Sequence, residues 1–123
     1  MVPTILAVDD NRIALISRRF LLESAGYKVV VAEDAAEAVD IVRQQPIDLV
    51  LMDYYLPSGN GSEARREMKR IQPGMPILVL SGATEVPADL ANVDAFLSKL
   101  DGPEYLIETL RKFLPPDNSS RAA

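Results

Sequence analysis

The sequence alternates short, continuous runs of apolar residues with segments of helical periodicity, and proline and glycine stand between them. A strand that is covered on both faces is apolar at nearly every position, whereas a strand with one wet face alternates apolar and polar residues. The apolar runs lie at residues 4–8, 27–32, 46–52, 77–80 and 93–97. The alternation predicts an α/β fold: a doubly wound, five-stranded parallel sheet with helices on both faces.

The helical segments differ in how well their patterns are defined. The first, residues 11–25, carries apolar residues at helical spacing: Ile13, Ile16, Phe20 and Leu21. The second has Asp34 as its expected N-cap and is closed by Pro46. Residues 83–92 leave room for only one or two turns, with Pro87 in the first. We therefore expect a fourth helix that is short or irregular.

Length and composition limit the class of protein. The 123 residues fit one domain, predicted at residues 1–114, and the polar, proline-broken residues 115–123 predict a disordered tail. Lys+Arg 13 against Asp+Glu 18 gives a net charge of −5, which argues against binding to nucleic acid or to an anionic membrane. The chain lacks histidine and cysteine, so histidine catalysis and thiolate chemistry are excluded. No segment resembles a membrane span or a secretory signal, and the expected location is the cytoplasm.

Polar residues stand where the predicted strands end. Asp9 and Asp10 follow the first strand and Asp53 the third, while Ser81 follows the fourth and Lys99 follows near the end of the fifth. Ligands of open α/β sheets bind outside the carboxyl ends of the strands. Clustered carboxylates repel one another unless a cation is present, and Mg²⁺ prefers such oxygen ligands. A carboxylate can also attack a phosphoryl group and hold it as an acyl phosphate.

Each of these residues also has an ordinary structural explanation. Asp10 can cap the first helix, Asp53 can begin a turn, and Lys99 can lie in solvent. The combined pattern is harder to explain in this way, because four different strands would have to contribute independently.

The ordered set resembles a response regulator receiver domain, the phosphorylatable module of two-component signalling, with its flavodoxin-like fold. The resemblance covers about residues 3–114 and is carried by Val8-Asp9-Asp10-Asn11, Leu51-Met52-Asp53-Tyr54-Tyr55-Leu56-Pro57, Gly61, Glu63, Ser81-Gly82 and Phe96-Leu97-Ser98-Lys99. It implies a phosphoacceptor rather than a turnover enzyme, a domain that supports its own phosphotransfer and autodephosphorylation.

The resemblance also implies the roles of individual residues. Asp53 would accept the phosphoryl group from a histidine kinase or a histidine phosphotransfer protein, and Ser81 and Lys99 would bond the phosphoryl oxygens. Mg²⁺ would be held by carboxylates and one main-chain carbonyl, from Asp9, Asp10, Asp53 and Tyr55. Ser81 and Phe96 would form the conformational switch that regulates binding to a downstream protein.

Two departures from the family pattern affect these expectations. Leu100 follows Lys99 where the family usually has proline, often with a cis bond, so the lysine loop can be set differently. The interval from Ser81 to Lys99 is about four residues shorter than is common, which shortens the fourth helical segment. The predicted tail points to a single-domain form that acts by binding a partner, and a homodimer stays open because the usual pairing surface is the altered one.

Three alternatives remain at the level of sequence. A degenerate receiver would dock a partner without phosphorylation. A flavodoxin-like electron carrier would need a hydroxyl- and glycine-rich phosphate loop after the first strand, where this chain has Asp9-Asp10-Asn11. A dehalogenase-like phosphatase would need a second aspartate two residues after the first, and Asn11 stands there.

Overall fold

The computed structural model describes residues 2–57, 59, 61–82 and 86–116. It contains a five-stranded parallel sheet in the order β2-β1-β3-β4-β5. The strands are β1 (Thr4–Val8), β2 (Lys28–Ala32), β3 (Leu49–Asp53), β4 (Ile77–Ser81) and β5 (Ala95–Ser98). The helices are α1 (Arg12–Ser24), α2 (Ala35–Gln44), α3 (Ser62–Ile71) and α4 (Gly102–Phe113), with a 3₁₀ turn at Lys99–Asp101. The predicted fold class is confirmed.

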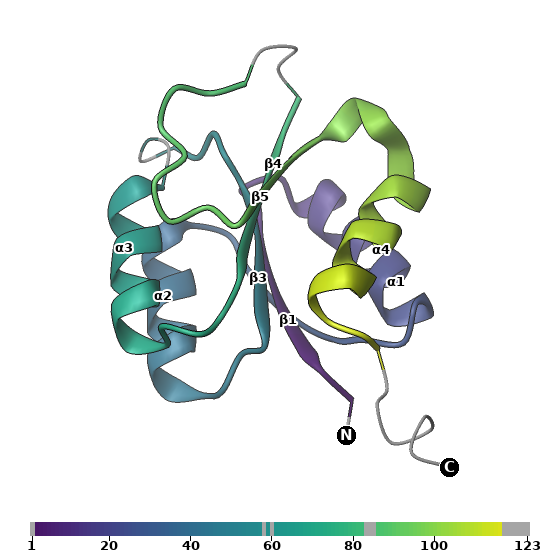
Figure 1. Cartoon of the computed structure of the whole chain (residues 1–123), viewed down its shortest axis with the longest axis horizontal. Helices are drawn as coiled ribbons and strands as arrows, with labels where there is room; N and C mark the ends of the chain where they lie inside the picture. The colour runs from purple at the N-terminus through teal and green to yellow at the C-terminus, as the bar shows by residue number, and fades with distance from the viewer. Residues whose placement is uncertain (1, 58, 60, 83–85, 117–123) are drawn as a thin grey trace.

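The sheet is covered on both faces, with α2 and α3 on one side and α1 and α4 on the other (Figure 1). All five residues of β3 and all five of β4 are buried. Alternate strand residues contribute to two separate apolar cores, because successive side chains point to opposite faces of a sheet. None of the helices in the described ranges is both long and apolar enough to span a membrane.

Helix α1 forms where predicted, but its apolar spacing marks the exposed side. The residues that α1 buries are Leu15 and Leu22, whereas Ile13, Ile16 and Phe20 are 80%, 70% and 74% exposed. These three of the four apolar residues at helical spacing therefore lie on a face that no other element of the described chain covers, whereas the fourth, Leu21, is partly buried and packs against the core. The caps fit better: Asn11 Oδ1 accepts a hydrogen bond from Ala14 N, and Asp34 caps α2 as predicted.

The connection between β4 and β5 differs from an ordinary α/β crossover. Its residues 83–85 lie outside the described ranges, and the described residues 86–94 contain no helix. Asn92 has a positive φ of 62°, and Leu90 and Val93 pack against the core on the α2/α3 face of the sheet. The expectation of a short or irregular fourth helix is wrong for the described residues 86–94, where a non-helical chain runs beside α3 (Figure 1).

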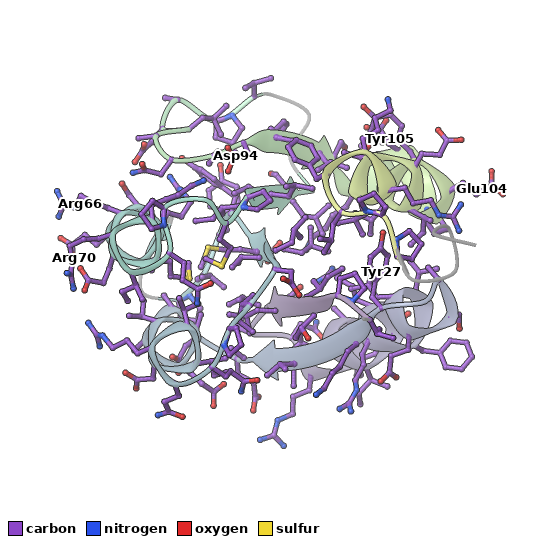
Figure 2. All side chains as sticks on the ribbon, turned by 60° about the horizontal axis from the view of Figure 1, so that its bottom comes forward. Tyr27, Arg66, Arg70, Asp94, Glu104 and Tyr105 are labelled. Atoms are coloured by element: carbon purple, nitrogen blue, oxygen red, sulfur yellow. The ribbon has the colours of Figure 1, made fainter. Side chains whose placement is uncertain are left out.

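The end of the described chain returns to the start of β2. The Tyr27 hydroxyl donates a hydrogen bond to the Leu114 carbonyl (Tyr27 is labelled in Figure 2). The predicted disordered tail begins at residue 115, and its residues 117–123 lie outside the described part of the chain.

Candidate functional site

The strand register explains why distant polar residues meet at one edge of the sheet. Val8 of β1 pairs with Met52 of β3, so Asp9 lies beside Asp53. Asp53 in turn pairs with Leu80 of β4, which places Ser81 one residue further along. Because all the strands are parallel, their polar ends share the carboxyl edge where open α/β sheets bind ligands.

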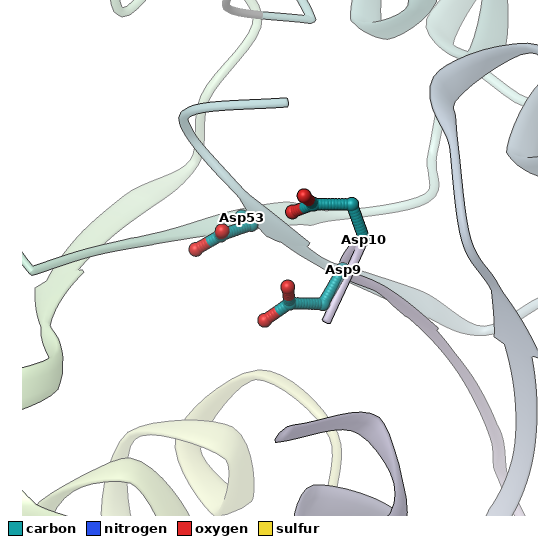
Figure 3. A group of neighbouring side chains, drawn as sticks. All are labelled: Asp9, Asp10 and Asp53. Atoms are coloured by element: carbon teal, nitrogen blue, oxygen red, sulfur yellow. The ribbon is translucent and has the colours of Figure 1, made fainter. Parts of the chain in front are cut away.

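Three carboxylates form the centre of this edge. Asp9, Asp10 and Asp53 each offer an oxygen, and these oxygens all lie within 4.8 Å of one another. Figure 3 shows the side chains projecting to the same side of the strand ends. Asp9 and Asp53 are buried, and Asp10 is exposed. Since Asn11 caps α1, the Asp10 carboxylate is not needed as a helix cap.

Two cations contact the carboxylates. Lys99 Nζ lies 2.7 Å from Asp53 Oδ1 and 3.7 Å from Asp9 Oδ2, so Lys99, although exposed, is directed at the carboxylates. Arg18 Nη1 of α1 lies 3.1 Å from Asp9 Oδ2. Sequence reasoning missed Arg18, and the available signal was its position seven residues, about two helical turns, after the N-cap Asn11.

The lysine loop takes a form that depends on Leu100. Residues Lys99–Asp101 make a 3₁₀ turn, and the Leu100 N–H donates to Ser98 Oγ at 3.1 Å. Proline at this position would lack that N–H. No cis peptide bond occurs in the described ranges, so this chain directs Lys99 at Asp53 by a serine-capped turn.

The remaining predicted residues occupy distinct environments near the edge. Ser81 is buried at the end of β4. Phe96 of β5 is half-buried and packs against the core on the α2/α3 face. Tyr55 is 60% exposed, and its ring meets the Tyr54 ring edge-on at 4.9 Å.

The donor set fits a hard divalent cation. Mg²⁺ prefers oxygen ligands and is commonly held by one or two carboxylates together with waters and phosphate. Asp9, Asp10 and Asp53 supply three negative charges, of which Lys99 and Arg18 balance two. The described residues of the edge therefore retain a negative charge that a bound cation would neutralise.

The ionisation of Asp53 reflects this crowding. Burial raises the pKa of the Asp53 carboxyl above its ordinary range, the hydrogen bond from Lys99 lowers it, and the charge of Asp9 raises it again, leaving a raised pKa overall. The folded protein thus holds the Asp53 proton more tightly than the unfolded chain does. Its contribution to stability is complete below the unfolded pKa and is lost as the pH rises through the folded pKa.

We therefore expect Asp53→Asn to stabilise the protein near pH 7 in buffer containing a metal chelator. Removing a charge that the fold disfavours should raise the thermal midpoint by about 2–5 °C, and the gain should vanish below the ordinary carboxyl pKa of about 4. Thermal unfolding followed by circular dichroism from about pH 3 to 8 measures this. A midpoint below that of the wild type at pH 7 would contradict the assigned electrostatics.

Relatives among known proteins match most of the chain. A family model described as the response regulator receiver domain matches residues 5–111. The response regulator MprA of Mycolicibacterium vanbaalenii is 33% identical over 127 residues, covering 97% of this chain and 55% of that protein. The transcriptional regulatory protein GlrR of Escherichia coli is 33% identical over 99 residues, covering 77% of this chain and 22% of that protein. The chain thus spans about half the length of the first relative and about a fifth of the second.

Solved structures agree with this assignment. A CheY-like response regulator receiver domain protein from Methanospirillum hungatei superposes with a TM-score of 0.84 at 28% identity, covering 91% of this chain and 93% of that one. The response regulator TrrA of Thermotoga maritima, in complex with Mg²⁺–BeF, gives a TM-score of 0.84 at 25% identity over 91% and 99% of the two chains. With the match to residues 5–111, these similarities show that the chain belongs to the response regulator receiver domain family.

Proposed function

We propose that this receiver domain accepts a phosphoryl group on Asp53 from a phosphohistidine of a histidine kinase or a histidine phosphotransfer protein. The observation that carries the proposal is the Asp53 carboxylate at the carboxyl edge of the sheet, with Lys99 Nζ 2.7 Å from its Oδ1 and two further carboxylates beside it. Phosphoacceptance is the general function of the family, and this geometry supports the assignment to Asp53.

The transfer exchanges one bond to phosphorus for another. A carboxylate oxygen of Asp53 attacks the phosphorus as the N–P bond of the phosphohistidine breaks, and the bonding pair returns to the donor imidazole. Since these 123 residues contain no histidine, the phosphohistidine lies outside this domain. Lys99 stays next to the oxygens that gain negative charge during transfer, and fixed positive charge at such a position lowers the barrier.

Asp9, Asp10, Asp53 and the main-chain carbonyl of Tyr55 would hold Mg²⁺. When bound there, Mg²⁺ neutralises charge on the phosphoryl oxygens. Two observations support this assignment: the three-carboxylate donor set of this chain, and the similar fold of TrrA, which is described in complex with Mg²⁺–BeF.

Return to the resting state needs only water. In autodephosphorylation a water oxygen attacks the phosphorus, the acyl P–O bond breaks, and the products are the Asp53 carboxylate and inorganic phosphate. The domain is thus a phosphoacceptor whose phosphorylated state has a lifetime, and a single phosphoryl group is held and released in each cycle. Tyr55, 60% exposed at the site, stands where a side chain can restrict the approach of water.

Phosphorylation would be reported through Ser81 and Phe96. Ser81 would bond a phosphoryl oxygen, and Phe96, which is half-buried on the adjacent strand, would change rotamer. A bias of a few kcal/mol is enough to shift such a two-state equilibrium. A downstream protein that contacts the β4–β5 side of the domain would bind one of the two conformations.

The exposed stripe of α1 is the proposed docking face for the phosphoryl donor. Ile13, Ile16 and Phe20 are exposed and spaced three and four residues apart, and α1 begins directly after the acidic cluster. An apolar helical stripe of this kind suits the groove of a partner helix pair. The histidine kinase or phosphotransfer protein that donates the phosphoryl group would meet this face of α1 in the cytoplasm.

Labelling from acetyl phosphate tests the proposal. With Mg²⁺ present, the wild type should incorporate radioactive phosphate, and the label should be lost in hot alkali because acyl phosphates hydrolyse there. Asp53→Asn, which keeps the size of the side chain, should incorporate none, and Asp48→Asn on the exposed surface serves as the matched control. Equal labelling of the wild type and Asp53→Asn would contradict the proposal.

The alternative function is that of a degenerate receiver that docks a partner without phosphorylation. Leu100 after Lys99 and the short β4–β5 connection keep this alternative open, whereas the complete carboxylate set with Lys99 beside Asp53 argues against it. A wild type that neither binds Mg²⁺ at millimolar concentration nor takes up label would establish it. Membership of the receiver family argues against the flavin carrier and the dehalogenase-like hydrolase.

A further inference from the structure

Asp9 is held by more partners than its neighbours in the acidic cluster. Its Oδ1 accepts a hydrogen bond from Asn11 N at 2.9 Å, and its Oδ2 lies 3.1 Å from Arg18 Nη1 and 3.7 Å from Lys99 Nζ. The Asp9 and Arg18 side chains are only 2% and 11% exposed. This ion pair is therefore shielded from solvent, unlike the neighbouring arginine pair of α1, Arg19–Glu23, whose side chains are about half exposed.

The start of α1 and the helical repeat place Arg18 beside Asp9. Asn11 fixes the start of α1 immediately after the strand-end aspartates, and a residue two turns further along lies on the same side of the helix. The Arg18 side chain also lines a cavity of about 370 Å³ with Leu21, Leu97 and Leu106, between α1 and α4. The aliphatic part of Arg18 has apolar neighbours, so its charged end is directed to Asp9.

We propose that Arg18 is a positioning residue that competes with the divalent cation for Asp9 and thereby sets the Mg²⁺ affinity of the site. The inference rests on Mg²⁺ binding at Asp9, Asp10 and Asp53, as in the proposed function. Without Arg18 the described cluster of three carboxylates would be balanced only by Lys99. With Arg18 the cluster is one charge less negative, and the Asp9 Oδ2 atom is already occupied by a guanidinium N–H.

This arrangement has a definite consequence for metal binding. A cation that binds Asp9 must share the Oδ2 atom with the Arg18 guanidinium or displace that guanidinium. The positive charge of Arg18 also repels the cation. At the short distance between Arg18 and Asp9, adding or removing one charge in a partly buried site changes the affinity for a cation by about an order of magnitude or more. The arginine thus partly balances the charge of the acidic cluster at low Mg²⁺, and it makes loading of the site depend on a higher Mg²⁺ concentration.

Magnesium titration of arginine variants tests the inference. We expect Arg18→Met to bind Mg²⁺ about tenfold more tightly than the wild type, because methionine keeps the apolar packing and removes the charge. Arg18→Lys should stay within about threefold of the wild type, since it keeps the charge. The matched control is Arg19→Met, which makes the same change in net charge on the next residue without a contact to Asp9; its affinity should change by less than about twofold.

The measurement is a series of ¹H–¹⁵N spectra recorded at increasing MgCl₂ and constant ionic strength, with the dissociation constant taken from the amide shifts around Asp9 and Asp53. Thermal midpoints provide a second readout. In chelator, Arg18→Met should unfold at a lower temperature than Arg19→Met, and saturating Mg²⁺ should raise its midpoint more than that of the wild type. The arginine Nε–Hε signals of the wild type give a third readout that needs no variant: the Arg18 signal should move during the titration, and the Arg19 signal should not.

The outcomes separate this inference from the proposed function. Unchanged or weaker Mg²⁺ binding by Arg18→Met, with a normal wild-type titration, would overturn the role of Arg18 and leave the phosphoacceptor proposal intact. A wild-type Arg18 signal that stays fixed through Mg²⁺ saturation would do the same. Absence of any Mg²⁺ response in the wild type would overturn both.

Discussion

Replacing Arg65 by methionine is expected to lower the free energy of unfolding by about 3–5 kcal/mol, the range found when one partner of a buried charged network is removed. Arg65 lies on α3 and is fully buried. Its Nε donates to the Ala91 carbonyl at 3.0 Å, and its Nη2 donates to the Asp89 carbonyl at 3.2 Å. The variant would remove these donors from two main-chain carbonyls of the non-helical β4–β5 connection.

The environment of Arg65 explains why the effect should be large. Its guanidinium lies over the Tyr54 ring, 5.9 Å from the ring centre, and 3.7 Å from the Asp89 carboxylate. Burial lowers the pKa of Arg65, while the charges of Asp89 and Tyr54 raise it in part. The cation is therefore retained in a desolvated position only because several acceptors surround it. The hydrogen bonds from Arg65 to the carbonyls of residues 89 and 91 hold this non-helical segment against α3.

Chemical denaturation of Arg65→Met and of its neighbour Arg66→Met measures this effect. Arg66 is exposed, and Figure 2 shows it pointing outward from α3; its replacement should change stability by less than about 0.5 kcal/mol. Amide exchange of residues 89–93 should also accelerate in Arg65→Met more than exchange in β1. A loss of stability equal to that of Arg66→Met would show that the Arg65 contacts do not hold the connection.

Replacing Lys99 by methionine is expected to slow phosphorylation from acetyl phosphate by about 100-fold or more, the typical cost of removing one fixed donor from a charge-developing oxygen. Lys99 is the cation closest to Asp53, at 2.7 Å, in the described part of the site. Methionine preserves the length of the aliphatic chain, so the loss should be electrostatic in origin. The effect should appear in the rate at saturating Mg²⁺.

The rate of label incorporation in Lys99→Met is compared with that in Lys112→Met, which removes an exposed lysine from α4. The α4 variant should react at the wild-type rate. A Lys99→Met variant that phosphorylates within about threefold of the wild type would exclude Lys99 from the stabilisation of transferred charge.

The sheet and the position of the site were predictable from the sequence for a physical reason. Strands buried on both faces must be apolar throughout, and β3 and β4 show this without interruption until Asp53 and Ser81. Parallel pairing then forces their ends to the same edge. The proximity of Asp9, Asp10 and Asp53 agrees with these two facts, whereas the contact of Lys99 with Asp53 also depends on the serine-capped turn after β5.

The two arginines were missed because a charged residue is expected to face solvent. Arg65 follows the buried Ala64 and precedes the buried Met68 by three residues, so its spacing belongs to the apolar stripe of α3. Its side chain instead donates to carbonyls of the described, non-helical residues 89–91 of the β4–β5 connection. Arg18 is buried in the same way against a cavity whose shape depends on α4, a distant element that periodicity does not reveal.

The apolar spacing of residues 11–25 predicted helix α1, but spacing alone does not tell which side of a helix its neighbours cover. Ile13, Ile16 and Phe20 keep the periodicity of a core stripe and lie in solvent. The short interval before Lys99 did predict an irregular segment, but its anchoring by Arg65 depends on main-chain carbonyls that residue types cannot indicate.

Chemical mapping of the phosphorylated residue tests the central claim most directly. Borohydride reduces an acyl phosphate to the corresponding alcohol, so an aspartyl phosphate becomes homoserine at the modified position. After reaction of the wild type with acetyl phosphate and Mg²⁺, reduction and peptide sequencing by mass spectrometry should find homoserine at residue 53 and unchanged aspartate at residues 9 and 10. Homoserine at residue 9 or 10, or no homoserine in a sample that carries phosphate, would contradict the assignment of Asp53 as the phosphoacceptor.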